Sequence, residues 1–142
     1  MTRFKQSIEQ GYVKLIPSDR IKAKSLAKSA DEAVYSAKKI PLEPHTLKSI
    51  IRELYEGLRQ FCESIGYIQG YKFLSHEAIT YFIEEVLSEP KLSAKFDRYR
   101  KIRNGINYYG DDVSEETVNE ALTEIPELIA QLRKHVKNHN LQ

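Results

Sequence analysis

The sequence has a single cysteine, no tryptophan and no long hydrophobic run in its 142 residues. The lone thiol, Cys62, excludes an internal disulfide framework and a cysteine-rich zinc site. No stretch approaches the roughly 20 consecutive apolar residues that a transmembrane helix needs. Polar residues follow Met1, so we expect no signal peptide. These absences predict a soluble, cytoplasmic protein with no membrane partner.

The residues that are present are typical of a globular protein. Hydrophobic residues make up 41% of the chain and charged residues 30%, with a net charge of only +2. A chain of this length can bury a core without disulfides or metal. We therefore expect one domain over residues 1–142, with residues 1–17 as a short N-terminal extension.

The small net charge conceals a strong separation of charges along the chain. Residues 91–103 contain six bases and one acid, a net charge of +5, whereas residues 111–127 contain seven acids and no base, a net charge of −7. Residues 1–28 carry seven bases and two acids, a net charge of +5. One interpretation is that neighbouring antiparallel helices pair these charges. The others are a basic surface that binds phosphates or charged faces that dock a protein partner.

Helical periodicity dominates the chain, and no segment shows convincing strand alternation. Apolar residues three and four apart predict helices near residues 18–39, 44–65, 75–86, 90–108 and 112–136, with a further helix ending at Pro17. Ser18 and Pro44 are predicted to begin helices, and Gly66 is predicted to end one. Residues 67–74 are predicted to form a loop. The many alanines of residues 18–39 indicate a close approach to a neighbouring helix. The predicted fold class is all-α, an up-and-down bundle of four to five helices.

One charged residue breaks this pattern. At 100° per residue, Arg103 falls about 20° from Leu92 and in the middle of its helix's apolar stripe, with Asn107 on nearly the same side. An unpaired guanidinium among apolar side chains is costly. We therefore expect Arg103 to be paired inside the bundle, with Glu53 or Glu63 as candidates, or to face a cleft or a subunit interface. The stripe comprises Leu92, Phe96, Tyr99 and Ile106.

The segment from Arg103 to Gly110 resembles the signature of HEPN domains (higher eukaryotes and prokaryotes nucleotide-binding). In that family, a helical Arg, often followed by a polar residue such as Asn, precedes a His by about four to six residues. Residues 70–78 are similar to the bend before a middle helix in archaeal and bacterial members. The resemblance covers roughly residues 18–137.

The resemblance implies a helical bundle that forms a homodimer with an RNA site between the motif helices. Active members are metal-independent endoribonucleases, and many pair with nucleotidyltransferases in toxin–antitoxin modules. By position, Arg103 would contact phosphate, with Asn104 as the adjacent polar residue of the catalytic motif. We expect the remaining RNA or nucleotide contacts from Arg100, Lys101, Asn107, Tyr108 and Tyr109.

The sequence departs from the family where the His belongs, because Tyr108 stands there. A phenol has a pKa near 10 and is a poorer proton acceptor at neutral pH than imidazole. We therefore expect binding of RNA or a nucleotide, without a cofactor and with weak or no ribonuclease activity. One alternative is an active metal-independent endoribonuclease in which Tyr108 or another group replaces the His. The other is an interaction module that pairs with a nucleotidyltransferase.

The other histidines give weaker signals. His76 and Glu77 are adjacent at a predicted helix start, which indicates a helix-terminus feature more than an acid–base pair. His135 and His139 have a spacing that can bind a metal on one helix face, but no carboxylate flanks them, and we expect no metal site. Cys62 fits a small buried hydrophobic position.

Overall fold

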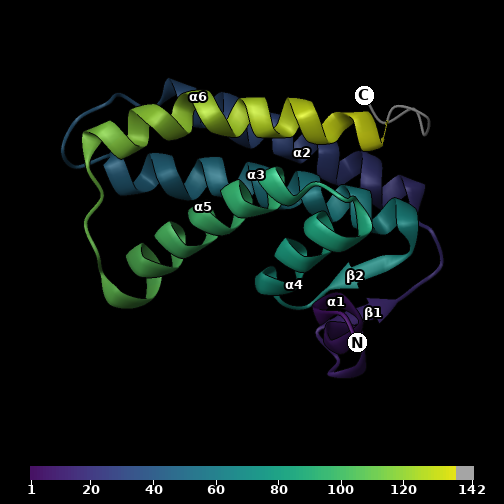
Figure 1. The fold of residues 1–142 in the computed structure, drawn as a ribbon. Helices are drawn as coiled ribbons and strands as arrows, with labels where there is room; N and C mark the ends of the chain where they lie inside the picture. The colour runs from purple at the N-terminus through teal and green to yellow at the C-terminus, as the bar shows by residue number, and fades with distance from the viewer. Residues whose placement is uncertain (137–142) are drawn as a thin grey trace.

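The computed structural model describes residues 1–136, which form six α-helices and two short strands (Figure 1). The predicted all-α fold class is confirmed. None of the helices in this range is long and apolar enough to cross a lipid bilayer. The helices are α1 (Arg3–Glu9), α2 (Arg20–Lys39), α3 (Leu47–Gln69), α4 (His76–Tyr81), α5 (Pro90–Tyr109) and α6 (Glu115–Leu132). The strands are β1 (Val13–Leu15) and β2 (Tyr71–Phe73); a π-helical turn (Phe82–Val86) continues α4, and a 3₁₀ turn (Arg133–His135) follows α6.

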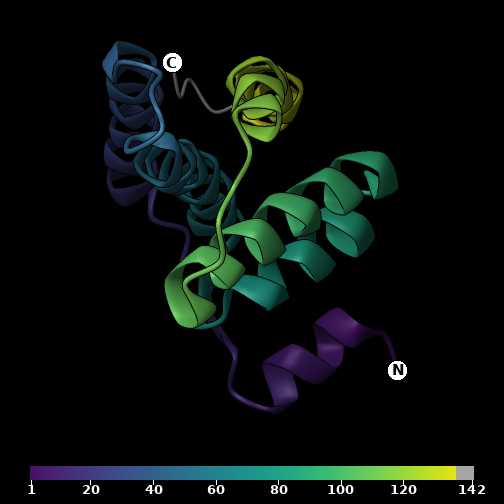
Figure 2. The same cartoon turned by 90° about the vertical axis from the view of Figure 1, so that its left-hand side faces the viewer.

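Helix α3 is the central element of the bundle. It contacts α2, α4, α5, α6 and β2, and its core-facing side chains are fully buried. Helices α2, α3 and α6 lie side by side, whereas α4 and α5 cross them obliquely as an antiparallel pair (Figures 1 and 2). The oblique pair carries the candidate site described below.

Helix α2 packs very closely on α3, as its alanines predict. Ala23, Ala30 and Ala37 are almost completely buried. A Cβ atom at Gly57 of α3 would lie 2.9 Å from Cγ2 of Val34 and 3.0 Å from the carbonyl oxygen of Ala30. Small residues on both helices therefore allow the two backbones to approach.

The helix predicted to end at Pro17 is much shorter in the structure. Helix α1 stops at Glu9, and Gly11 turns the chain with φ of +83°. Tyr12 and Leu15 then lie outside the helix and are largely exposed. Val13 pairs with Phe73 in the antiparallel β1–β2 ladder, so the prediction of no strand was wrong. Strands of three residues are too short to give an alternating signal.

The end of α3 also differs from the prediction. The helix continues past Gly66 to Gln69, and Gly70, with φ of +90°, caps it. Gly66 instead makes room for the ring of Phe73, whose Cε2 would lie 2.4 Å from an added Cβ. The predicted loop over residues 67–74 is therefore a helix end followed by β2.

Two predicted helix starts were displaced by one to three residues. Asp19, not Ser18, caps α2 and accepts a hydrogen bond from the backbone N–H of Lys22 at 2.9 Å. Pro44 lies in a turn before α3, whose N-cap is Thr46. The carboxylate of Asp19 is a stronger acceptor for a helix N-terminus than a hydroxyl.

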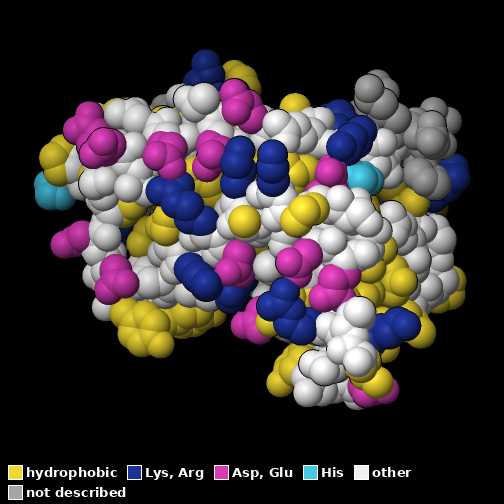
Figure 3. All heavy atoms as spheres, viewed as in Figure 1, with side chains coloured by type: hydrophobic (Ala, Val, Ile, Leu, Met, Phe, Trp, Pro, Cys, Tyr) yellow, Lys and Arg dark blue, Asp and Glu magenta, His cyan; other side chains and the backbone are white. Residues whose placement is uncertain are grey.

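The separated charges are partly paired between α5 and α6. Nζ of Lys95 lies 3.6 Å from Oε2 of Glu124, and Arg98 forms ion pairs with Glu120 and Glu124. The hydroxyl of Tyr99 also donates to Glu124 at 2.6 Å. Figure 3 shows basic and acidic side chains interspersed on this face. These contacts confirm that neighbouring helices account for part of the charge separation.

The close approach of α2 and α3 generates a stability prediction. Gly57→Ala should lower the free energy of unfolding by about 1–3 kcal/mol, because the new methyl group overpacks the interface by more than helix propensity restores. Urea denaturation measures the effect, and Ser49→Ala, on the exposed side of α3, is the matched control. A Gly57→Ala protein as stable as the wild type would contradict close packing here.

Candidate functional site

Arg103 lies on the inner side of α5, as its place on the helix predicts. Leu92, Phe96, Tyr99 and Ile106 of the same stripe are buried. The guanidinium carbon of Arg103 lies 5.4 Å from the ring centre of Tyr55 on α3 and 6.0 Å from that of Tyr108. Aromatic faces stabilise a cation at these distances. The guanidinium of Arg103 thus makes cation–π contacts with the rings of Tyr55 and Tyr108.

Arg103 has no carboxylate partner among residues 1–136. Its one polar contact there is a hydrogen bond from Nη1 to Oδ1 of Asn104 at 3.2 Å. The predicted pairing with Glu53 or Glu63 was wrong, since neither forms an ion pair with Arg103 and Glu63 pairs with Arg59. A cation that is partly buried and lacks an acid retains most of its capacity to bind an anion.

The other two bases predicted for the site, Arg100 and Lys101, already have acidic partners. Arg100 contacts Asp97 at 2.8 Å and Glu77 at 3.9 Å. Lys101, which is largely exposed, contacts Asp97 at 3.1 Å. Burial is the largest single effect on the pKa of Asp97 and raises it. The hydrogen bonds from Arg100 and Lys101, with the nearby positive charge, outweigh burial, so the pKa is lowered. Arg103 is therefore the cation of this cluster that is available to a ligand.

The guanidinium faces an open cavity of about 370 Å³ between the start of α4 and the last turns of α5. This volume lies in the range of small-ligand sites. The expectation that Arg103 faces a cleft is confirmed. The cavity is lined by Leu74, Ser75, His76, Glu77, Arg100, Arg103, Asn104 and Tyr108.

The structure brings His76 into the same cavity as Arg103. Nδ1 of His76 lies 3.1 Å from the hydroxyl of Tyr55, and the two rings are in contact. Burial, followed by the nearby guanidinium groups of Arg59, Arg103 and Arg100, lowers the pKa of His76 to about 4. The imidazole is therefore neutral at physiological pH, and its Nε2 has no partner among the described residues.

Tyr55 connects the two groups and was not identified from the sequence. It is almost completely buried, and burial raises the pKa of its phenol well above the usual value near 10. The neutral hydroxyl contacts His76 while the ring contacts Arg103. Tyr55 thus fixes the positions of an imidazole and a guanidinium that lie 27 residues apart in the sequence.

Not every predicted site residue lies in this cavity. Arg103, Asn104, Arg100 and Tyr108 line it, whereas Lys101 points away to Asp97. Oδ1 of Asn107 accepts a hydrogen bond from Nε of Arg52 at 2.7 Å, so this side chain serves the contact with α3.

The end of α5 exposes the two remaining aromatic residues of the motif. Tyr108 is 69% exposed and Tyr109 is 81% exposed. Hydrophobic side chains are visible at this end of the helix in Figure 3. Tyr108 contributes to the rim of the cavity, and Tyr109 lies outside it.

The remaining candidates from the sequence are structural in the described residues. Cys62 is fully buried, and burial raises the pKa of its thiol. Nε2 of His135 lies 3.1 Å from Oε2 of Glu89. His139 lies outside the described residues, so the expectation of no metal site at His135 and His139 stays a prediction. Within residues 1–136, no three His, Cys, Asp or Glu side chains are grouped in a way that could hold a metal ion.

Comparison with known proteins adds no relative. No protein-family model matches the chain, and no curated protein matches it.

The lowered pKa of His76 predicts acid lability. Between pH 6.5 and 4, the unfolded chain protonates this imidazole and the folded protein does not, so stability falls as pH falls through that window. His76→Asn should reduce the difference in urea midpoint between pH 7 and pH 4.5. His45→Asn, at an exposed position, is the control and should retain the wild-type difference. An unchanged pH dependence in His76→Asn would show that the imidazole is not protected from protonation.

Proposed function

We propose that this protein is a HEPN-like domain that binds RNA or a nucleotide through a phosphate group at Arg103. The observation that carries the proposal is the guanidinium of Arg103, which faces an open cavity without a carboxylate partner among the described residues. Phosphate oxygens would supply the missing anion and accept charge-assisted hydrogen bonds. A cytoplasmic location, where RNA is available, follows from this proposal.

The surroundings of Arg103 support a ligand larger than a free anion. Tyr108 presents an exposed ring at the rim, on which a nucleobase can stack. Asn104 adds an amide that can reach ribose or phosphate oxygens. Lys101 and Tyr109 would act only on a chain long enough to leave the cavity, since neither side chain lines it.

A homodimer is part of the proposal. The exposed Tyr108 and Tyr109 lie at the end of α5, and the exposed side chain of Leu74 borders the same cavity. A second copy packed on this end would cover the ring of Tyr109, leave Tyr108 facing the ligand, and bring two Arg103 cavities together. The interface then lies beside the ligand site, as the resemblance implies.

A nucleotidyltransferase partner is supported less well. The charge separation that motivated it is partly accounted for by the ion pairs of Lys95 and Arg98 with Glu120 and Glu124. Exposed pairs of this kind contribute little to stability, but they reduce the charge that a docking partner would meet.

The binding proposal predicts a specific loss on removal of Arg103. Arg103→Ala should weaken binding of single-stranded RNA at least about tenfold, because charge-assisted hydrogen bonds contribute roughly 1.5–3 kcal/mol. Filter binding at several salt concentrations measures this, and the wild-type affinity should fall with salt as counterions are released.

Lys91→Ala is the matched control. It removes one exposed positive charge from the same helix, far from the cavity lining. If Arg103→Ala and Lys91→Ala weaken RNA binding equally, the effect is nonspecific electrostatics and the site assignment fails.

A second candidate function, a metal-independent endoribonuclease, is favoured by the position of His76, whose lowered pKa would have to rise on phosphate binding for the imidazole to act as an effective base. For this role, Nδ1–H of His76 would donate to the Tyr55 hydroxyl and leave Nε2 to accept the proton of a ribose 2′-OH. The 2′-oxygen then bonds to the adjacent phosphorus and the bond to the 5′-oxygen of the next nucleotide breaks. The departing 5′-oxygen takes a proton from water and becomes a 5′-hydroxyl, a 2′,3′-cyclic phosphate forms, and His76 returns its proton to solvent. Arg103 would stabilise the charge on the phosphorane oxygens. His76, on another helix, would thus replace the His that the motif lacks.

This candidate predicts cleavage that depends on His76. Wild-type protein should cleave RNA in the presence of a chelator, and His76→Gln should lower the rate at least about 100-fold, as is typical for loss of a general base. His45→Gln, at an exposed position, should cleave like the wild type. Absence of cleavage by the wild type, or cleavage that survives His76→Gln, would reject the mechanism and leave the binding proposal intact.

A further inference from the structure

A second cavity, of about 400 Å³, lies between α1 and the start of α4. Gln6, Gln10, Tyr12 and Tyr81 are among the residues that line it. Ser75 and Glu77 line both this cavity and the Arg103 cavity. The two cavities therefore share part of their lining at the first residues of α4.

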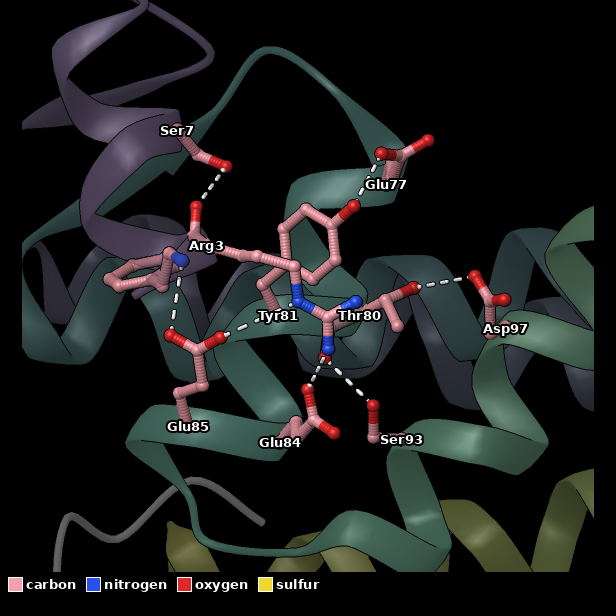
Figure 4. Close-up of polar contacts among 10 residues, drawn as sticks. Arg3, Ser7, Glu77, Thr80, Tyr81, Glu84, Glu85, Ser93 and Asp97 are labelled. Atoms are coloured by element: carbon pink, nitrogen blue, oxygen red, sulfur yellow. Dashed lines mark hydrogen bonds and ion pairs between the residues drawn. The ribbon is translucent and has the colours of Figure 1, made fainter. Parts of the chain in front are cut away.

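The one cation of the second cavity is neutralised, which argues against a phosphate there. Nη2 of Arg3 contacts Oε2 of Glu84 at 2.6 Å, and Nε lies 4.0 Å from Glu85 (Figure 4). Glu85 also accepts a hydrogen bond from the backbone N–H of Phe4 at 3.0 Å. Arg3 and Glu85 therefore hold α1 on the π-helical turn, and Arg3 covers the ring of Tyr81 at 4.6 Å.

Apart from the carboxylate of Glu77, the groups that are available in the second cavity are uncharged. The carboxamides of Gln6 and Gln10 have no hydrogen-bond partner among residues 1–136. Gln10 is the C-cap of α1, four residues after Gln6, and both side chains line this cavity. Each offers two N–H donors and a carbonyl acceptor. The ring of Tyr12 beside them is 51% exposed. Paired donors and acceptors next to an exposed aromatic ring match the edge and face of a nucleobase.

We propose that this cavity, formed by Gln6, Gln10 and Tyr12 beside the Arg103 cavity, is the base subsite of a nucleotide whose phosphate lies at Arg103. The inference rests on the proposed function, because it takes the phosphate position from there. The N-terminal segment is then part of the binding site, and it supplies the groups that distinguish one base from another.

Glu77 indicates which bases fit. Its Oε1 accepts a hydrogen bond from the hydroxyl of Tyr81 at 2.5 Å, and the carboxylate borders both cavities. A carboxylate favours bases with an exocyclic amino group and disfavours carbonyl oxygens at the same position. Gln side chains form paired hydrogen bonds with adenine through its amino group and ring nitrogen. The subsite therefore selects adenine over uracil.

Calorimetric titration with 5′-AMP, 5′-UMP and ribose 5-phosphate tests the subsite. The wild type should bind AMP more tightly than the other two probes. The double variant Gln6→Leu/Gln10→Leu should weaken AMP binding about tenfold, through loss of two neutral hydrogen bonds, and leave ribose 5-phosphate unchanged. Gln131→Leu, at an exposed position on α6, is the control, and circular dichroism checks the fold of each variant.

The outcomes separate the subsite from the proposed function. If the double variant binds AMP like the wild type, or loses ribose 5-phosphate as well, the base subsite is wrong while phosphate binding at Arg103 stands. Equal affinity of the wild type for AMP and UMP also rejects the selection of adenine. If Arg103→Ala binds all three probes like the wild type, or if the wild type binds none, the proposed function fails together with the subsite.

Discussion

The site depends on one arrangement, a guanidinium that contacts two aromatic rings and has no carboxylate partner among the described residues. Tyr55 and Tyr108 flank Arg103, while the neighbouring bases Arg100 and Lys101 are paired with Asp97. A cation in this position is costly unless water or an anion reaches it, and the cavity provides that access. The same positive potential contributes to the neutral state of His76, whose pKa is lowered chiefly by burial.

The fold supplies this arrangement by bringing α4 to the end of α5. Gly66 and Gly70 let the chain leave α3 and return as β2, directly before His76. The β1–β2 ladder and the contacts of Arg3 then hold α1 beside α4. The N-terminal segment is therefore integrated with the helical domain, and it borders the site instead of trailing away from it.

The sequence predicted the features that depend on local periodicity. The all-α class, the close approach of the alanine-rich helix to a neighbouring helix, and the inward position of Arg103 were all correct, because each follows from helical spacing or residue size. The predicted end of α3 at Gly66 was wrong. This glycine is needed because the ring of Phe73 packs against it, and not because it caps the helix. The three-residue strands gave no usable pattern.

The contacts that position Arg103 could not be predicted from the sequence. His76 was identified as a helix-terminus residue, and Tyr55 was not identified at all, because their contacts with each other and with Arg103 arise from tertiary packing between three helices. Helical spacing predicted Asn107 beside Arg103. In the structure, the side chain of Asn107 instead accepts a hydrogen bond from Arg52 of α3. Periodicity therefore found the cation and missed the groups that position it.

The most direct test of phosphate binding at Arg103 is the pKa of His76, followed by NMR during a titration with inorganic phosphate. In the ligand-free protein the imidazole should titrate near pH 4. A phosphate bound beside Arg103 places negative charge in the cavity that His76 lines, so the pKa of His76 should rise, and Arg103→Ala should abolish that rise. A pKa that is unchanged at saturating phosphate, or that rises equally in Arg103→Ala, would contradict the account.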